Sequence, residues 1–175
     1  MDASGNIFLI GPMGVGKSTV GRRLAEATGR RFIDADEEIE RRTGVRIEVI
    51  FEIEGEPGFR QREARVLDEL TRLQGIVLAT GGGAVLDPEN RARLKRNGSV
   101  VYLSAPVEVL VHRTARDRSR PLLKGTDRRQ RIDELLRQRE PLYQEIADVV
   151  VDTSAHSVRD SVDEICRRLG LTCVS

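Results

Sequence analysis

The sequence predicts a three-layer α/β fold in which helices cover both faces of a parallel sheet. Short apolar runs alternate with longer stretches of helical periodicity, and most of these runs are continuous, as is typical of strands that are buried on both faces. The length of 175 residues fits one compact domain, which we expect to span residues 1–175. The expected strands are 7–10, 32–33, 76–79, 100–103 and 149–151.

Helical periodicity fills the intervals between these strands. Glycine and proline mark the turns, including the stretch from Gly55 to Gly58. The expected helices are 17–28, 35–43, 57–73, 88–96, 106–115, 128–146 with an interruption at Pro141, and 157–169.

Composition and charge restrict the class of protein. A hydrophobic fraction of 39%, a charged fraction of 33% and a net charge of +1 are typical of a globular protein and argue against broad nucleic-acid binding. No apolar run approaches the roughly 20 residues that a membrane span needs. Residues 1–6 are polar and leave no room for a signal peptide. We therefore expect a cytoplasmic protein that binds neither membranes nor nucleic acid.

The cysteines and histidines form no recognisable site. Cys166 and Cys173 belong to no CxxC or Cys/His pattern, so we expect both to be reduced and structural. His112 and His156 stand in no metal-ligand or nucleophile pattern, and we expect them to be structural as well.

The strongest motif is a phosphate loop. The segment GPMGVGKS, residues 11–18, fits the pattern G-x-x-x-x-G-K-[ST] and lies between an expected strand and an expected helix. Glycines let the backbone direct its N–H groups at phosphates, and the helix N-terminus adds partial positive charge. Lys17 would reach the β and γ phosphates, and Ser18 would coordinate Mg²⁺. A purely structural glycine turn is the alternative, which the flanking strand and helix disfavour. No D-x-x-G or N-K-x-D follows the loop, which disfavours a GTPase switch.

Carboxylates and glycines follow the next two strands. Asp34 and Asp36 come directly after strand 32–33, and Gly81–Gly83 follow strand 76–79. Ligands bind beyond the carboxyl ends of strands in open α/β sheets, so we expect both groups near the phosphate loop. One aspartate could face a metal while the other accepts a hydrogen bond from a hydroxyl, although such a pair can equally cap a helix. Three glycines allow close backbone approach to a ligand, although a tight turn would explain two of them.

Two groups of charged residues admit both a functional and a structural interpretation. Glu63 falls on an apolar stripe by its i+4 spacing from Phe59, and Arg60 neighbours it, so the two form an inward ion pair, a binding fork or an ordinary surface pair. Between Arg113 and Arg131 the chain carries eight basic and two acidic residues, which form either a solvated face or a binding surface.

Taken together, the motifs resemble those of the shikimate kinase family. The match in identity, order and approximate spacing covers about residues 6–165 and rests on GPMGVGKST, DAD, IFEIEGEPGFRQRE, ATGGGAV, RSRPLL and REPLYQEIAD. Many families share the phosphate loop, but its combination with the two aspartates, F-R-x-x-E, the triple glycine and the arginine–proline segment is specific to this one. Gluconate kinase, a relative in architecture, would not present it.

The resemblance implies a nucleoside-monophosphate-kinase-like fold with a five-stranded parallel sheet, a substrate-binding region near 34–63 and a mobile lid near 114–127. The implied reaction is ATP-dependent phosphorylation of shikimate at its 3-hydroxyl, giving shikimate 3-phosphate and ADP in aromatic amino acid biosynthesis. Mg²⁺ is the implied cofactor, shikimate and ATP are the partners, and a monomer is expected.

The resemblance also assigns roles to residues. Arg60 and Arg139 would hold the carboxylate of shikimate, Asp36 would bind its hydroxyl, and Glu63 would orient one of the arginines. Arg120 would approach the γ-phosphate when the lid closes. The implied catalytic residues are Lys17, Asp36 and Arg120, and the metal ligands are Ser18 and Asp34. Nucleotide binding is assigned to Gly14, Val15, Gly16, Lys17, Ser18, Thr19, Arg113, Arg120 and Thr153. Substrate binding is assigned to Asp36, Arg60, Glu63, Gly81, Gly82, Gly83 and Arg139.

Two other functions stay open at this point. A P-loop kinase for another small hydroxylated acceptor would share the nucleotide machinery but have a differently charged acceptor pocket. A noncatalytic nucleotide-binding or arginine-rich interaction module would bind ATP or RNA without acceptor-dependent turnover.

Overall fold

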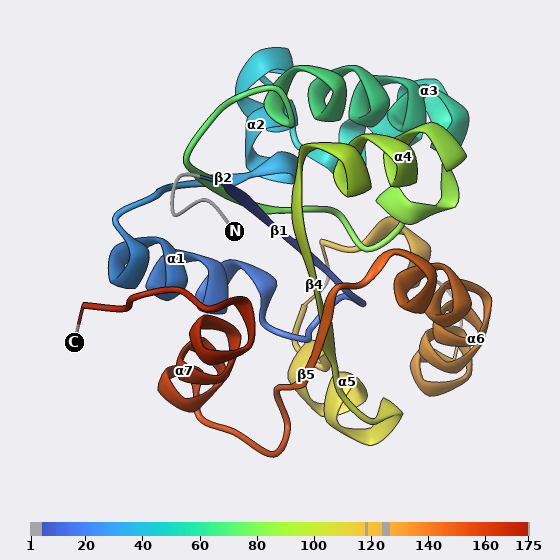
Figure 1. The fold of residues 1–175 in the computed structure, drawn as a ribbon. Helices are drawn as coiled ribbons and strands as arrows, with labels where there is room; N and C mark the ends of the chain where they lie inside the picture. Colours follow the sequence, from blue (N-terminus) through green and yellow to red (C-terminus); the bar gives the residue numbers. More distant parts are fainter. Residues whose placement is uncertain (1–4, 118, 124–126, 175) are drawn as a thin grey trace.

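The computed structural model describes residues 5–117, 119–123 and 127–174. Five parallel strands form one sheet in the order β2-β3-β1-β4-β5 (Figure 1). The chain builds first to one side of β1 and then to the other, so the carboxyl end of β1 is a switch point, where ligands bind in such sheets. The predicted fold class is confirmed. The strands are β1 (Asn6–Ile10), β2 (Arg31–Asp34), β3 (Ile76–Ala79), β4 (Gly98–Ser104) and β5 (Val149–Asp152).

Helices cover both faces of this sheet. In Figure 1, α1 and α7 lie on one side, and α2, α3 and α4 lie on the other. Alternation along β1 builds a separate core on each face, because Ile7 and Leu9 pack into one cluster while Phe8 and Ile10 pack into the other. The helices are α1 (Lys17–Thr28), α2 (Ala35–Thr43), α3 (Ile47–Leu70), α4 (Pro88–Asn97), α5 (Val107–Thr114), α6 (Arg128–Ile146) and α7 (Val158–Leu169), with short 3₁₀ turns η1 (Ala84–Leu86) and η2 (Pro121–Leu123).

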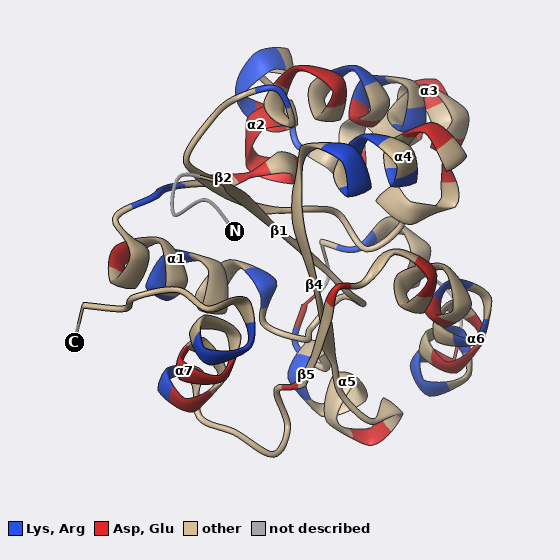
Figure 2. Cartoon of the chain, viewed as in Figure 1, with Lys and Arg blue, Asp and Glu red and all other residues tan. Residues whose placement is uncertain are grey.

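Charge follows the same layering. Figure 2 shows acidic and basic residues interspersed on the outer helices, whereas β1 and β4 carry none. Within the described part of the chain, no helix combines the length and the apolar character that a membrane crossing requires.

The helix α3 differs from the prediction. It begins at Ile47 and ends at Leu70, whereas the sequence predicted a helix over 57–73 and a turn from Gly55 to Gly58. Gly55 adopts φ 71° and ψ 179°, which kinks the helix instead of ending it. Pro57 then lies at the start of the second half, where its missing N–H is tolerated.

The predicted interruption of α6 at Pro141 is also wrong. The helix runs from Arg128 to Ile146 with the proline inside it. Proline removes one backbone hydrogen bond, but buried side chains on both sides of it, including Leu135 and Tyr143, hold the two halves in the core.

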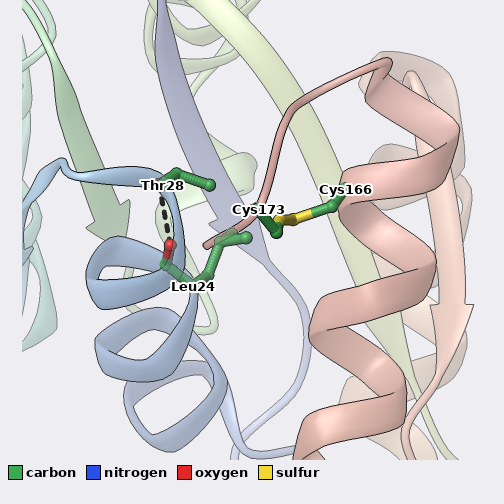
Figure 3. The surroundings of a disulfide bond; sticks show 4 residues. All are labelled: Leu24, Thr28, Cys166 and Cys173. Atoms are coloured by element: carbon green, nitrogen blue, oxygen red, sulfur yellow. Dashed lines mark hydrogen bonds between the residues drawn. A yellow bond between two sulfur atoms is a disulfide. The ribbon is translucent and has the colours of Figure 1, made fainter. Parts of the chain in front are cut away.

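The prediction that the two cysteines are reduced is wrong as well. Cys166 on α7 forms a disulfide with Cys173 in the C-terminal tail, with their Cα atoms 6.4 Å apart (Figure 3). The tail turns back after α7, where the N–H of Leu171 donates to the carbonyl of Cys166 at 2.8 Å. Figure 3 shows the bond beside Leu24 and Thr28 of α1. The chain reversal at Gly170, the C-cap of α7, therefore brings together two cysteines that belong to no known sequence motif.

Candidate active site

The phosphate loop, residues 11–16, connects β1 to α1. Its glycines Gly11, Gly14 and Gly16 have φ values of 145°, 80° and 101°, which other residues rarely adopt. Gly16 is the N-cap of α1 and supplies no side chain, so the first N–H groups of the helix are left for an anion. Lys17 lies over the loop and donates from Nζ to the carbonyls of Gly11 at 2.6 Å and Pro12 at 2.8 Å. The loop thus has the geometry of an anion site with a lysine poised beside it.

Asp34 joins the end of β2 to the phosphate loop. Ser18 Oγ donates to Asp34 Oδ2 at 2.5 Å. The other carboxylate oxygen, Oδ1, accepts from the backbone N–H groups of Asp36 at 2.9 Å and Glu37 at 3.1 Å, which caps α2. Asp34 therefore caps α2 as one of the two alternatives predicted, and its second oxygen contacts Ser18, so the cap does not exclude a role beside the phosphate loop.

The donors at Ser18 and Asp34 suit a hard cation. Mg²⁺ prefers oxygen ligands and usually takes one or two protein carboxylates, with phosphates and water completing its shell. Among the described residues, no three His, Cys, Asp or Glu side chains gather as a protein-only metal cage. A hydroxyl beside a carboxylate is therefore a donor set that fits Mg²⁺ bound together with a nucleotide.

The pKa values of Asp36 and Lys17 are both shifted from the ordinary values of these side chains. Burial, reinforced by the negative charge of Asp34, raises the pKa of Asp36 to about 6. Burial, together with the positive charge of Arg120, lowers the pKa of Lys17 to about 7. Asp36 Oδ1 is buried and has no hydrogen-bond partner. An unpartnered carboxylate oxygen with a pKa near 6 is able to accept a proton from a substrate hydroxyl.

On α3, the buried Glu63 forms an ion pair with the partly buried Arg60. Glu63 is 1% exposed, so the interpretation as an ordinary surface pair is wrong. Arg60 Nη1 lies 3.0 Å from Glu63 Oε1, and burial raises the pKa of Glu63 to about 7. Of the two arginines that Glu63 was expected to orient, Arg60 is the one that it contacts. Arg139 of α6 is 3% exposed, and its Nε has no partner.

The triple glycine packs against these charged groups. A Cβ atom at Gly81 would lie 2.8 Å from Glu63 Oε2 and 3.0 Å from Asp36 Oδ1. A Cβ atom at Gly83 would collide with the guanidinium of Arg60. The glycines therefore do more than form a tight turn, because they leave room for the side chains of the site.

Two adjoining cavities contain these residues. A cavity of about 610 Å³ lies over the phosphate loop, and every residue predicted to bind nucleotide lines it. A second cavity of about 470 Å³ lies toward α3 and α6, and every residue predicted to bind the acceptor lines it. The residues that line both cavities are Met13, Asp36, Glu40, Gly81, Gly82 and Arg120.

Arg113 and Thr153 support the phosphate loop from outside. Arg113 Nη1 donates to the carbonyl of Val15 and to Thr153 Oγ1, both at 3.1 Å. Thr153 Oγ1 in turn donates to the carbonyl of Val15 at 2.8 Å. These bonds hold the loop from the side of the first cavity that lies away from the aspartates.

The arginine-rich segment is more than a solvated face. Arg120 Nε lies 2.8 Å from Asp117 Oδ2, and Arg128 donates to the carbonyls of Thr114 and Asp117. Arg131 donates to the carbonyl of Leu122 at 3.1 Å. The predicted lid, 114–127, includes residues 118 and 124–126, which lie outside the described residues.

Sequence reasoning missed several cavity residues. Glu40 follows Asp36 by one turn of α2, and its i+4 spacing was the available signal. Phe51 lies in the second cavity with its ring centroid 4.9 Å from that of Phe59, and the misplaced start of α3 concealed it. His156, which we expected to be structural, is exposed and lines the first cavity.

A phosphate loop at the switch point of a parallel sheet, open to a second charged cavity, defines a P-loop kinase that acts on a small molecule. The particular family follows from comparison with known proteins. The family model described as shikimate kinase matches residues 13–170, and the chain belongs to the shikimate kinase family.

Individual relatives agree with this assignment. The shikimate kinase of Thioalkalivibrio sulfidiphilus is 58% identical over 167 residues, which are 95% of this chain and 88% of the relative. That of Nitrosococcus oceani is 56% identical over 164 residues, or 94% and 86% of the two chains. A solved shikimate kinase from Acinetobacter baumannii, in complex with shikimate, superposes with a TM-score of 0.92 at 52% identity and covers 94% of this chain and 92% of that one.

Proposed function

We propose that this chain transfers the γ-phosphoryl group of ATP to the 3-hydroxyl of shikimate, producing shikimate 3-phosphate and ADP in aromatic amino acid biosynthesis. The observation that carries the proposal is the junction of the two cavities at Asp36, where a phosphate loop meets a pocket lined by Arg60 and Arg139. The 52% identity to a shikimate kinase solved with shikimate supports the choice of acceptor.

At the nucleotide end, the N–H groups of the phosphate loop would receive the β-phosphate. Lys17 would exchange its bonds to the carbonyls of Gly11 and Pro12 for bonds to the β and γ oxygens. Arg120 would leave Asp117 for the γ-phosphoryl group and offset the charge that develops there. Ser18 and Asp34 would hold Mg²⁺, which, when bound, neutralises charge on the β and γ phosphates.

At the acceptor end, Arg60 and Arg139 would hold the carboxylate of shikimate by charge-assisted hydrogen bonds. Glu63 would keep the guanidinium of Arg60 in place through its 3.0 Å contact. Asp36 Oδ1 would accept the hydrogen bond of the 3-hydroxyl and receive its proton as the phosphoryl group transfers. Direct in-line transfer requires no covalent intermediate with the enzyme.

The proposal extends to the context in which the enzyme works. Because residues of this one chain line both cavities, we propose that the chain forms a single kinase domain that is active as a monomer. Residues 34–63 would form the substrate-binding region, and segment 114–127 would close as a lid that carries Arg120 over both cavities. We propose a cytoplasmic location, where ATP is available.

The test is ADP release by the purified protein with ATP and Mg²⁺, measured with shikimate and compared with gluconate, nucleoside monophosphates and no acceptor. We expect strong and selective stimulation by shikimate. Stimulation by another acceptor would keep the kinase class and reject shikimate. ATP binding without turnover on any acceptor would favour a noncatalytic nucleotide-binding module.

A further inference from the structure

Tyr143 of α6 is a buried side chain to which the proposed mechanism gives no role. It is 0% exposed, and its hydroxyl donates to the carbonyl of Gly82 at 2.5 Å, a contact between residues 61 positions apart. The guanidinium of Arg139, one helical turn earlier on α6, lies close enough to this hydroxyl that its positive charge counters the rise that burial gives to the pKa of Tyr143. One hydroxyl therefore connects α6 to the triple-glycine loop beside an arginine of the acceptor cavity.

The bond to Gly82 fixes an entire peptide unit. A trans peptide is planar, and its carbonyl and N–H point in opposite directions. Holding the carbonyl of Gly82 therefore also sets the direction of the N–H of Gly83. The carbonyls of Gly81 and Gly83 accept hydrogen bonds within the turn that enters η1, both at 3.1 Å. Tyr143 supplies the middle glycine with the hydrogen bond that the turn gives to its neighbours.

Gly82 lies where the two cavities meet. A Cβ atom there would be 3.4 Å from Arg139 Nη1, 3.5 Å from the backbone nitrogen of Met13 and 3.6 Å from the carbonyl oxygen of Gly11. The loop thus lies in contact range of the acceptor arginine on one side and the phosphate loop on the other. A shift of this peptide by a fraction of an ångström would change the position of the acceptor relative to the phosphates.

The ring of Tyr143 is held from behind by Tyr102 of β4. Their ring centroids are 5.0 Å apart, and the planes are stacked at 28°. Burial, together with the negative charge of Glu140, raises the pKa of the Tyr102 phenol. These are the two tyrosines of the chain, so the protein provides a matched pair of buried phenols, one on β4 and one on α6, of which Tyr143 contacts the loop.

We propose that Tyr143 is a positioning residue for phosphoryl transfer. Its hydroxyl orients the Gly82–Gly83 peptide and the guanidinium of Arg139 together, so that the carboxylate and the reacting hydroxyl of the acceptor are held in one fixed relation to the phosphate loop. This inference rests on the proposed function, because it specifies how the same acceptor cavity is ordered.

The test compares Tyr143→Phe with Tyr102→Phe. Each change removes one hydroxyl and keeps the stacked rings. For Tyr143→Phe we expect roughly a tenfold rise in the KM for shikimate and a several-fold fall in kcat, because a buried carbonyl loses its partner beside the guanidinium of Arg139. The Kd for ADP should stay within twofold of the parent value. Tyr102→Phe should leave KM and kcat within twofold.

A second acceptor separates positioning from a general structural effect. With a shikimate analogue whose carboxylate is reduced to an alcohol, the KM penalty of Tyr143→Phe should shrink, since Arg139 then has no carboxylate to hold. An equal penalty with both acceptors would overturn the inference, as would kcat and KM within twofold of the parent or a matching loss of ADP affinity. A parent protein that turns over a different hydroxy acid would reject the proposed function alone, because the same pair of variants with that acceptor still tests Tyr143.

Discussion

The two ends of the active site are built differently. At the nucleotide end, consecutive residues and their backbone do most of the work, because residues 11–16 curl between one strand and one helix and even Lys17 rests on backbone carbonyls. At the acceptor end, side chains converge from α2, α3 and α6, which are far apart in the sequence. A phosphate loop can therefore serve many kinases, whereas the choice of acceptor depends on how distant helices meet.

Of the four buried side-chain polar atoms without a hydrogen-bond partner among the described residues, three belong to the acceptor cavity and the fourth, Ser161 Oγ, lies in the nucleotide cavity. Buried polar atoms without a partner, among the described residues of the acceptor cavity, are Asp36 Oδ1, Glu63 Oε2 and Arg139 Nε. Such atoms cost about 1–3 kcal/mol each when buried unpaired. A compact acid that carries several hydroxyls offers donors to the first two and an acceptor to the third, so the acceptor end is organised for its ligand at the expense of stability.

The largest expected effect is on chemistry at the junction of the two ends. Asp36→Asn should lower kcat by about 10³-fold, because an amide cannot take the proton of the hydroxyl. The Kd for ADP should stay within a few-fold, as measured by titration calorimetry. Asp133→Asn, the same chemical change at a partly exposed site on α6 outside both cavities, is the matched control. Unchanged turnover in Asp36→Asn would remove this residue from the mechanism.

The next largest effect is expected on the KM for shikimate alone, which distinguishes the acceptor end from the nucleotide end. Arg139→Lys keeps the positive charge but loses the planar fork that grips a carboxylate, so the KM for shikimate should rise about 10- to 100-fold. The KM for ATP should change little in the same steady-state assay. Arg137→Lys is the control, since that side chain lies on the same helix and is 81% exposed. Equal changes in both KM values would mean that the two ends are not separable in this way.

A pH titration tests the nucleotide end alone. With a pKa of about 7, Lys17 is charged below pH 7 and loses its charge above it in the free protein. Phosphates favour the charged form, so the Kd for ADP should rise by up to about tenfold per pH unit above 7, with uptake of a proton on binding. Calorimetry in two buffers of different ionisation heat measures that uptake. Lys17→Arg should abolish the pH dependence, and a flat parent profile between pH 7 and 9 would disprove the assignment.

The smallest effect on activity is expected far from both substrates. Cys173→Ser opens the link between α7 and the tail, and the chain-entropy estimate for so short a loop is about 2 kcal/mol of unfolding free energy. Denaturant unfolding should show this loss, while kcat and both KM values remain unchanged. The parent protein in excess reductant should match the variant. If the unfolding free energy of the parent protein is the same with and without reductant, the disulfide does not contribute to stability.

Much of the fold was predictable because its signals are local. Each strand was located to within a residue or two, since parallel strands buried on both faces appear as continuous apolar runs. The first half of α3 was missed because Gly55 and Pro57 mark a turn in most sequences, and only the surrounding contacts make them a kink. The disulfide was missed because pairing depends on the reversal after α7.

In the active site too, features that follow from local signals were predictable, and features that depend on contacts between distant segments were not. The strand ends were sufficient to predict that Asp34, Asp36 and the triple glycine would gather beside the phosphate loop. No spacing rule links Tyr143 to Gly82, because that contact depends on how α6 packs against η1, the turn that follows the triple glycine. Likewise, the sequence placed Glu63 beside Arg60 without deciding whether the pair was buried. The roles of these residues in catalysis stay predictions until the variants are measured.

The shared wall at Gly82 has a consequence for inhibitors. Gly82 lines both cavities, so a compound that spans them would lie against a backbone without a side chain, next to the path of the transferred phosphoryl group. Any substitution at Gly82 that blocked such a compound would also obstruct the transfer itself. Resistance by this route would therefore disable the enzyme that it was meant to protect.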